Sequence, residues 1–157
     1  MEKFPSLEEV QKIFAEYKRE IFQEIEKETK IKFKIKEIKF EKWNKDYWSC
    51  GINRILIGNY HKPKSKILTS VIHEAIHINT RYLNLNYKEN SIAVEISTCV
   101  SATRIIKRLN KKFKKKFKMN KFDEHYQKYE KREKEFEKLK DNKGFYEFFE
   151  LIKNEIK

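Results

Sequence analysis

The chain has 157 residues, a length typical of one domain, and 39% of them are charged, with a formal net charge of +13. It contains only three glycines and two prolines, which excludes collagen-like repeats and proline-rich linkers. No apolar run approaches the roughly 18 residues of a membrane-spanning helix, and residues 1–6 lack the apolar region of a signal peptide, so we expect the cytoplasm and no membrane contact.

The first predicted element is an amphipathic helix that begins after Ser6 and ends near Glu28. Ser6 and Glu9 have the spacing of a capping box, in which each side chain bonds to the backbone amide of the other residue. Apolar residues then recur at three- and four-residue spacing, as on one face of a helix. They are Val10, Ile13, Phe14, Tyr17, Ile21 and Ile25. We expect this face to pack on the sheet that follows.

A small sheet is predicted over residues 31–58. Residues 31–35 alternate apolar and basic side chains, as a strand with one solvent-exposed face does. The alternation breaks near Lys36 and Glu37, which indicates a bulge or a second strand, and Arg54–Gly58 is a short apolar strand. We therefore expect three mostly antiparallel strands and an α+β fold.

The next predicted helix carries the sequence His73-Glu74-Ala75-Ile76-His77, an HExxH motif. Pro63 suits the first turn of this helix, and Asn84–Tyr87 end it. Residues four apart lie on one face of a helix, so both imidazoles can bind one metal ion while Glu74 lies beside them. Apolar residues form a broad face around the motif: Ile67, Leu68, Val71, Ile72, Ala75, Ile76 and Leu83.

A further helix is predicted to begin at Asn90 or Ser91, and it carries Glu95 within its apolar stripe. A carboxylate on a buried face is costly unless a cation or a hydrogen-bond donor meets it. A metal ion held by the two histidines would be such a cation. Two alternatives stay open: Glu89 as the acidic ligand, although it precedes the helix, and a salt bridge between Glu95 and Arg104 or a lysine.

Residues 118–157 are predicted to be a helical C-terminal extension, packed on a domain that spans residues 1–117. Phe122–Leu139 has the pattern of one helix and Phe145–Ile156 that of another, with Asp141–Gly144 between them. Because both are aromatic on one side, we expect them to lie on the rest of the chain.

A basic run extends from Arg104 to Lys121 without an acidic residue. A solvated helix face explains such a run, and weak, salt-dependent contact with nucleic acid is the alternative. Phe113 and Phe117 lie within the run, and we expect them to pack on the protein rather than to stack on bases.

Cys50 and Cys99 are too few for a disulfide framework and are not spaced as the ligands of a zinc ribbon. We expect two buried thiols in a reducing compartment. A bridge between them is the alternative, because the lysine and glutamate content would suit a thermophile, and cytosolic disulfides occur in some thermophiles.

An HExxH motif followed by a glutamate on a separate helix resembles the gluzincin class of zinc metallopeptidases, and the short chain resembles the minigluzincins in particular. The resemblance covers roughly residues 1–110. It implies that His73, His77 and Glu95 bind Zn²⁺. It also implies that Glu74 is the general base, which takes a proton from water and passes it to the leaving amine.

The resemblance also implies where a peptide substrate would bind. In gluzincins, an edge strand before the active-site helix binds extended substrate by main-chain pairing. Arg54–Asn59 would be that strand here, with Ile57, Gly58 and Asn59 beside the reacting centre. The candidates for stabilising the transition state are Tyr60, His61, Tyr82 and Tyr87.

The chain departs from the family pattern at Cys99. Larger gluzincins often have an acidic residue there, which orients a ligand histidine, so this role is unfilled or falls to Ser97, Thr98 or another residue. Minigluzincins are also known as latent forms in which a terminal segment blocks the cleft. Residues 118–157 would have that role in this chain.

We therefore expect a zinc-dependent peptidase, in an active or a latent form, that acts on a peptide or protein substrate. Two alternatives use the basic run Arg104–Lys121. One is a regulatory peptidase that cuts a DNA-bound repressor, as the similar ImmA/IrrE-like proteins do. The other is a zincin-fold module that binds nucleic acid and whose zinc is structural. Glu74 favours an enzyme, because a structural site needs no base.

Overall fold

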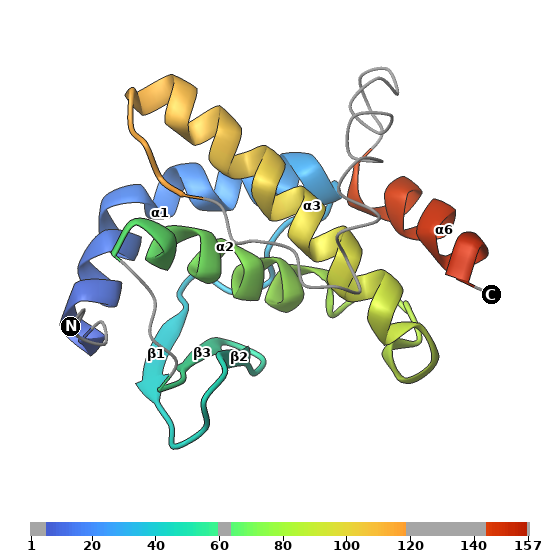
Figure 1. Ribbon diagram of the computed structural model, residues 1–157, viewed down its shortest axis with the longest axis horizontal. Helices are drawn as coiled ribbons and strands as arrows, with labels where there is room; N and C mark the ends of the chain where they lie inside the picture. Colours follow the sequence, from blue (N-terminus) through green and yellow to red (C-terminus); the bar gives the residue numbers. More distant parts are fainter. Residues whose placement is uncertain (1–5, 60–63, 119–143, 157) are drawn as a thin grey trace.

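The computed structural model describes residues 6–59, 64–118 and 144–156 (Figure 1). Its elements follow in chain order as helix α1 (Leu7–Thr29), strands β1 (Lys39–Lys42), β2 (Ser49–Cys50) and β3 (Arg54–Ile57), and helices α2 (Lys64–Thr80), α3 (Tyr87–Phe113) and α6 (Phe145–Ile156). The expected α+β class is confirmed. Among the described helices, none combines the length and the apolar content that crossing a membrane requires.

Helix α1 begins where the capping pattern predicts. The Ser6 hydroxyl accepts a hydrogen bond from the Glu9 amide at 3.1 Å, which satisfies one of the free amides of the first turn. The helix ends at Lys30, whose φ of 61° is left-handed and whose amide donates to the Glu26 carbonyl. The apolar face packs on α2 and α3 as well as on β1. Its buried residues include Val10, Phe14, Tyr17, Ile21 and Ile25.

The sheet is mixed, with three strands in the order β1–β3–β2. Strand β1 pairs parallel with β3, and β2 pairs antiparallel with β3. The prediction of mostly antiparallel strands is therefore wrong for β1. The chain reverses once before β2 and once between β2 and β3, and these two reversals return β3 to the direction of β1.

Residues 31–35, predicted as the first strand, do not form one. Side chains of two helices bind their backbone instead. The Phe33 amide donates to the Glu26 carboxylate at 2.7 Å, and the Asn79 side-chain amide donates to the Ile31 carbonyl at 2.9 Å. Because these groups are already bonded, the segment packs its apolar side chains without a neighbouring strand.

Helix α2 lies at the centre of the molecule, between the sheet and the helices α1 and α3 (Figure 1). Its Pro63 lies outside the described residues. Leu83, predicted on the apolar face of this helix, follows it and is partly buried. The remaining predicted apolar residues have 0% exposure: Ile67, Leu68, Val71, Ile72, Ala75 and Ile76. The most buried helix is therefore the one that carries the HExxH motif.

Helix α3 begins earlier than predicted, at Tyr87. Its backbone is not helical at Asn90, where φ is −117° and ψ is 24°, so the predicted start coincides with a kink. Ile92, predicted to face inward, is 42% exposed, because the kink precedes it and the buried face begins at Ala93.

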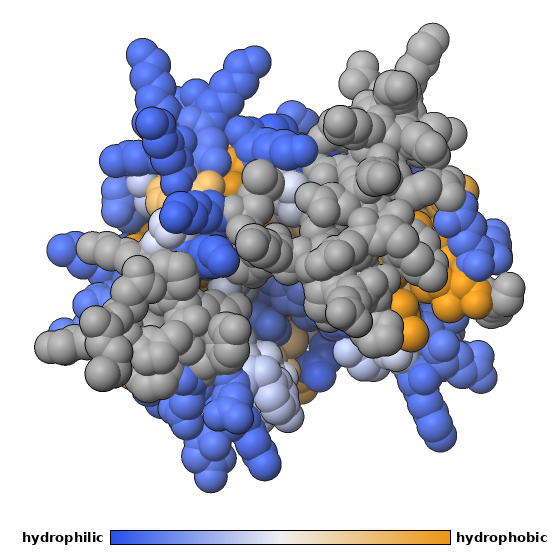
Figure 2. Space-filling view, viewed as in Figure 1, coloured by the Kyte–Doolittle hydropathy of each residue, from blue (hydrophilic) through white to orange (hydrophobic). Residues whose placement is uncertain are grey.

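Helix α6 has the predicted bounds and completes the core. Its buried residues face α3 and α1, whereas other apolar side chains of α6 show at the right of the face in Figure 2. The predicted helix over Phe122–Leu139 lies outside the described residues. The side chains that α6 buries are Phe145, Phe148, Phe149 and Ile152.

We predict that Phe148→Ala lowers the free energy of unfolding by about 3–5 kcal/mol, because Phe148 has 0% exposure and its loss would leave a cavity between α6 and α3. Urea denaturation measures this change. Tyr146→Ala is the matched control, since this ring on the same helix is 46% exposed, and we expect it to cost less than about 1 kcal/mol. Equal losses in the two variants would contradict a core role for α6.

Candidate metal centre

The two histidines of the motif lie side by side on the one face of α2 that is open to solvent. Every residue from Ile67 to Thr80 is buried except His73 and His77, which are partly exposed. Their Nε2 atoms are 3.2 Å apart. The four-residue spacing causes this geometry, because such residues are stacked along a helix face. Both imidazoles therefore point to one position.

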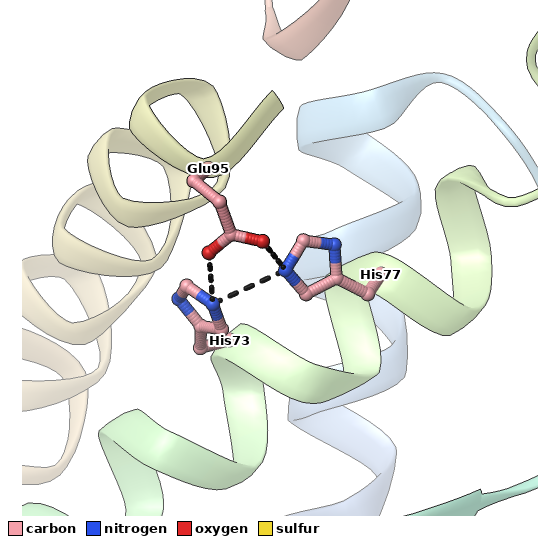
Figure 3. A group of neighbouring side chains, drawn as sticks. All are labelled: His73, His77 and Glu95. Atoms are coloured by element: carbon pink, nitrogen blue, oxygen red, sulfur yellow. Dashed lines mark hydrogen bonds and ion pairs between the residues drawn. The ribbon is translucent and has the colours of Figure 1, made fainter. Parts of the chain in front are cut away.

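Glu95 reaches the same position from α3 (Figure 3). Its Oε2 lies 3.2 Å from Nε2 of His73, and its Oε1 lies 2.8 Å from Nε2 of His77. The residues on either side of Glu95 are buried, so this turn of α3 is anchored in the core. The predicted proximity of Glu95 to both histidines is thus confirmed, whereas Glu89 is exposed and lies outside the group.

The spacing of these donor atoms fits a tetrahedral metal ion. One nitrogen from each histidine and one oxygen from Glu95 lie within 4.8 Å of one another. Ligands about 2.1 Å from a tetrahedral zinc ion are about 3.4 Å apart, close to the separations of 2.8–3.2 Å between these atoms. Two facing imidazole nitrogens also need a proton or a cation between them, because their lone pairs repel.

Electrostatics draw the three side chains together. Burial favours a protonated Glu95, but the hydrogen bonds and positive charges of His73 and His77 outweigh it and hold the pKa of Glu95 well below its usual range. Burial likewise favours a neutral His73, but its contacts with Cys99 and Glu95 raise the pKa of His73 well above its ordinary value. The group therefore stabilises positive charge at the point where its donors converge.

Cys99 lies next to His73. Its Sγ lies 3.7 Å from Nδ1 of His73, the ring nitrogen that faces away from Glu95. Ser97 and Thr98 donate instead to backbone carbonyls one turn earlier in α3. The sequence offered one signal for this contact, since Cys99 follows Glu95 by one helical turn.

The candidate site lines a cleft of about 730 Å³, a volume common for ligand-binding pockets. One wall is the edge strand β2 with the preceding residues Tyr47 and Trp48, and the other is the loop between α2 and α3 together with the start of α3. His73, Glu74 and Glu95 line the floor between them. A chain segment can therefore approach the three donor atoms along β2.

Glu74 lies in this floor with 8% exposure, beside the donor group. Cys50 of β2 interacts with Glu74. Cys50 and Cys99 are both free thiols, so the two cysteines form no bridge. Burial and the charge and hydrogen bond of Glu74 raise the pKa of Cys50 to about 12. The thiol therefore stays protonated near neutral pH and donates to the Glu74 carboxylate. No motif in the sequence indicated this contact.

Among the residues considered for stabilising a transition state, Tyr87 lies at the site. Its hydroxyl donates to Oε1 of Glu95 at 3.2 Å, and burial and the charge of Glu95 raise the pKa of Tyr87 to about 12. Tyr82 does not line the cleft, and its ring lies under Nζ of Lys34 at 4.2 Å. Tyr60 and His61 lie outside the described residues.

The prediction that Arg54–Asn59 is the edge strand is wrong. Strand β3 is the central strand, with β1 on one side and β2 on the other. Ile57 has 0% exposure, a Cβ on Gly58 would lie 2.3 Å from the Tyr47 carbonyl oxygen, and the Asn59 amide donates to a neighbouring carbonyl. Ile57 is thus used inside the sheet, and Gly58 and Asn59 contact the segment before β2, because β2 occupies the side that we assigned to substrate. Strand β2 is the edge at the cleft.

The arginines of the basic run hold α3 to α1. Nε of Arg104 lies 3.2 Å from the Glu28 carboxylate, and Nε of Arg108 lies 2.6 Å from that of Glu24. Glu28 is 4% exposed, and burial raises its pKa although both arginines oppose the rise. These partly buried arginines are therefore used to join two helices, rather than standing free for a partner.

The lysines of the same run remain at the surface. Phe113 and Phe117 pack edge-on against Tyr17 of α1, as predicted, with ring centroids 5.3 Å and 5.4 Å away. Contact between the lysines and nucleic acid stays a prediction. The exposed lysines are Lys107, Lys111, Lys112, Lys114, Lys115, Lys116 and Lys118, and Lys121 lies outside the described residues.

Comparison with protein-family models, with curated proteins and with solved structures finds no match to the chain. The chemistry of the site therefore has to be argued from its own residues. Two imidazoles and a carboxylate converge, a further buried carboxylate lies beside them, and an edge strand borders the cleft.

We predict that Zn²⁺ at about 100 times its dissociation constant raises the free energy of unfolding of the wild-type chain by about 2.7 kcal/mol, and that this gain is absent in Glu95→Gln. Because Glu95→Gln also removes two ion pairs, the quantity to compare is the zinc-dependent increment in thermal unfolding. Glu89→Gln is the control and should keep the increment, since Glu89 is exposed outside the donor group.

We further predict that Cys99→Ala weakens zinc affinity about tenfold or more, because His73 loses the partner of its second ring nitrogen. Competition with a chromophoric chelator measures the affinity. Cys99→Ser should restore part of it. Cys50→Ala is the matched control and should bind zinc as the wild type does, because its thiol contacts Glu74. Equal affinities in Cys99→Ala and the wild type would refute a positioning role.

Proposed function

We propose that the chain is a zinc-dependent peptidase of the gluzincin type. The observation that supports this best is the position of Glu74, a carboxylate with 8% exposure beside three converging metal-ligand atoms. A structural metal site has no use for such a carboxylate. A general base for hydrolysis has to lie in this position.

Under this proposal, His73, His77 and Glu95 hold the metal ion and leave one coordination position open to the cleft. When bound, zinc supplies Lewis acidity to water and to the carbonyl of a peptide bond. Glu74 accepts a proton from the attacking water and delivers it to the leaving amide nitrogen. The burial of Glu74 excludes bulk water that would otherwise take up this proton.

Two neighbouring hydroxyl and thiol groups would assist. The Cys50 thiol of β2 donates to the Glu74 carboxylate. The Tyr87 hydroxyl, 3.2 Å from Glu95, is the donor at the site that could turn toward an oxyanion as charge develops there. Tyr87 is suited to this task because its pKa of about 12 keeps the proton on the hydroxyl at neutral pH.

The substrate in this proposal is an extended peptide that pairs with the free edge of β2. Ser49 and Cys50 line the cleft from that edge, next to Glu74. Main-chain pairing supplies affinity without regard to side chains, and side-chain pockets add specificity. Strand β2 thus replaces Ile57, Gly58 and Asn59 as the proposed binding segment.

The resemblance to minigluzincins also suggested latency. Helix α6 lines no part of the cleft and is buried against α3 and α1, so the proposed blocking role does not involve this helix. Residues 119–143 lie outside the described residues, and their part in latency stays a prediction. The two free thiols agree with a reducing compartment, and we keep the cytoplasm as the proposed location.

We predict that Glu74→Gln lowers the rate of peptide hydrolysis by about 10²- to 10⁴-fold and leaves zinc stoichiometry unchanged, because the variant removes the proton acceptor and no metal ligand. A dye-quenched unfolded protein serves as substrate, and metal content is measured on the same samples. Glu89→Gln is the matched control on an exposed turn. Undiminished hydrolysis in zinc-loaded Glu74→Gln would disprove the proposed mechanism.

A further inference from the structure

Arg81 is a residue of the cleft that the proposed mechanism does not use. It follows the last residue of α2 and lies one helical turn beyond His77, on the side of the helix that carries both histidines. It is exposed, and it lines the cleft together with Glu74 and Trp48. The positive charge of Arg81 thus lies at one end of the row formed by His73 and His77.

The guanidinium of Arg81 has no carboxylate partner within residues 6–59, 64–118 and 144–156. Three described arginines, Arg54, Arg104 and Arg108, differ in this respect. Arg54 pairs with Glu41 at 3.1 Å, and Arg104 and Arg108 pair with the carboxylates of α1. Arg81 therefore presents its donors to the space of the cleft.

Arg81 lines the same cleft as Ser49 and Cys50 of β2. Its positive charge opposes the rise in the pKa of Cys50. The acidic groups in the lining are Glu74 and Glu95, and the imidazoles of His73 and His77 lie beside them. Among the described residues that line the cleft, Arg81 is the only arginine or lysine.

We infer that Arg81 binds a carboxylate of the peptide substrate and so determines which peptides the cleft accepts. This inference rests on the proposed peptidase function and specifies its substrate class. A planar guanidinium forms two parallel hydrogen bonds with a carboxylate, which gives both affinity and orientation. The cleft is open enough to admit such a group, and the carboxylate would replace water at Arg81.

The position of Arg81 limits where this carboxylate lies in the substrate. One helical turn separates its Cα from that of His77, a rise of about 6 Å along the axis. An extended peptide advances about 3.3 Å per residue. The carboxylate therefore belongs to a residue within about two positions of the cleaved bond. It is either an acidic side chain or the free C-terminus of a peptide, and both have the same chemistry.

The test uses the full chain with Glu74→Gln, so that bound peptides are not cut, and loads it with zinc. Three short N-acetylated alanine-based peptides are titrated by calorimetry: one with a single Asp and an amidated C-terminus, one with Asn and a free C-terminus, and one with Asn and an amide. The Asp is moved along the peptide in a series. We expect a carboxylate peptide to bind about tenfold more tightly than the neutral one.

The same titrations are repeated with Arg81→Gln added, and the preference for carboxylate should disappear while the neutral peptide binds as before. Arg19→Gln, an exposed arginine of α1 away from the cleft, is the matched control and should keep the preference. A preference for Asp assigns the site to acidic side chains, and a preference for the free C-terminus assigns it to chain ends. Equal binding of all peptides, or a preference that persists in Arg81→Gln, would overturn the inference.

These results are separable from the fate of the proposed function. If wild-type protein hydrolyses peptides with equal efficiency whether or not they carry a carboxylate, the role of Arg81 fails and the peptidase stands. If zinc-loaded wild-type protein hydrolyses no peptide of the series, the proposed function fails. Carboxylate binding that depends on Arg81 would then still show a binding site at this position.

Discussion

The burial of helix α2 is the constraint on which the candidate site depends. Packing by α1, α3 and the sheet removes every side chain between Ile67 and Thr80 from solvent, apart from the partly exposed His73 and His77. A helix held on so many sides cannot rotate or slide without disrupting close packing. The two imidazoles therefore keep their direction without help from a metal ion. Glu95 depends on the same packing, because the buried residues beside it fix α3 against α2.

Polar side chains of α2 connect this rigid helix to segments that have little regular structure. Asn79 binds the Ile31 carbonyl, and Thr69 donates to the Lys118 carbonyl at 2.7 Å. Each bond satisfies a backbone group that would otherwise be costly to leave unpaired near the interior. The chain before β1 and the end of the basic run are thus attached to α2. The helix that orients the histidines also organises the loops around it.

The sequence correctly predicted features that depend on local periodicity. The predictions failed where contacts between residues distant in the sequence determine the structure. The cap of α1, the bounds of α6 and the meeting of Glu95 with both histidines follow from helical spacing and from the cost of an unpaired carboxylate. The alternation over residues 31–35 had the pattern of a strand, but side chains of α1 and α2 bind that backbone. The edge strand could not be assigned, because strand order depends on non-local pairing and the two residues of β2 are too short for a pattern. The thiol contacts of the site depend on the same non-local packing.

The two thiols give the site a charge balance that differs from one built with acidic neighbours. With the proposed zinc bound, the two negative charges of Glu74 and Glu95 balance the two positive charges of the ion, and the protonated Cys50 adds no charge. A carboxylate beside Nδ1 of His73 would make this ring a stronger electron donor and would add a negative charge. Cys99 makes a longer and weaker contact at 3.7 Å, so under the proposed function His73 would donate less and a bound zinc ion would keep more of its Lewis acidity. The same weak contact would lower the affinity for zinc. The chain therefore depends on the rigid burial of α2 together with the Cys99 contact to keep His73 in place.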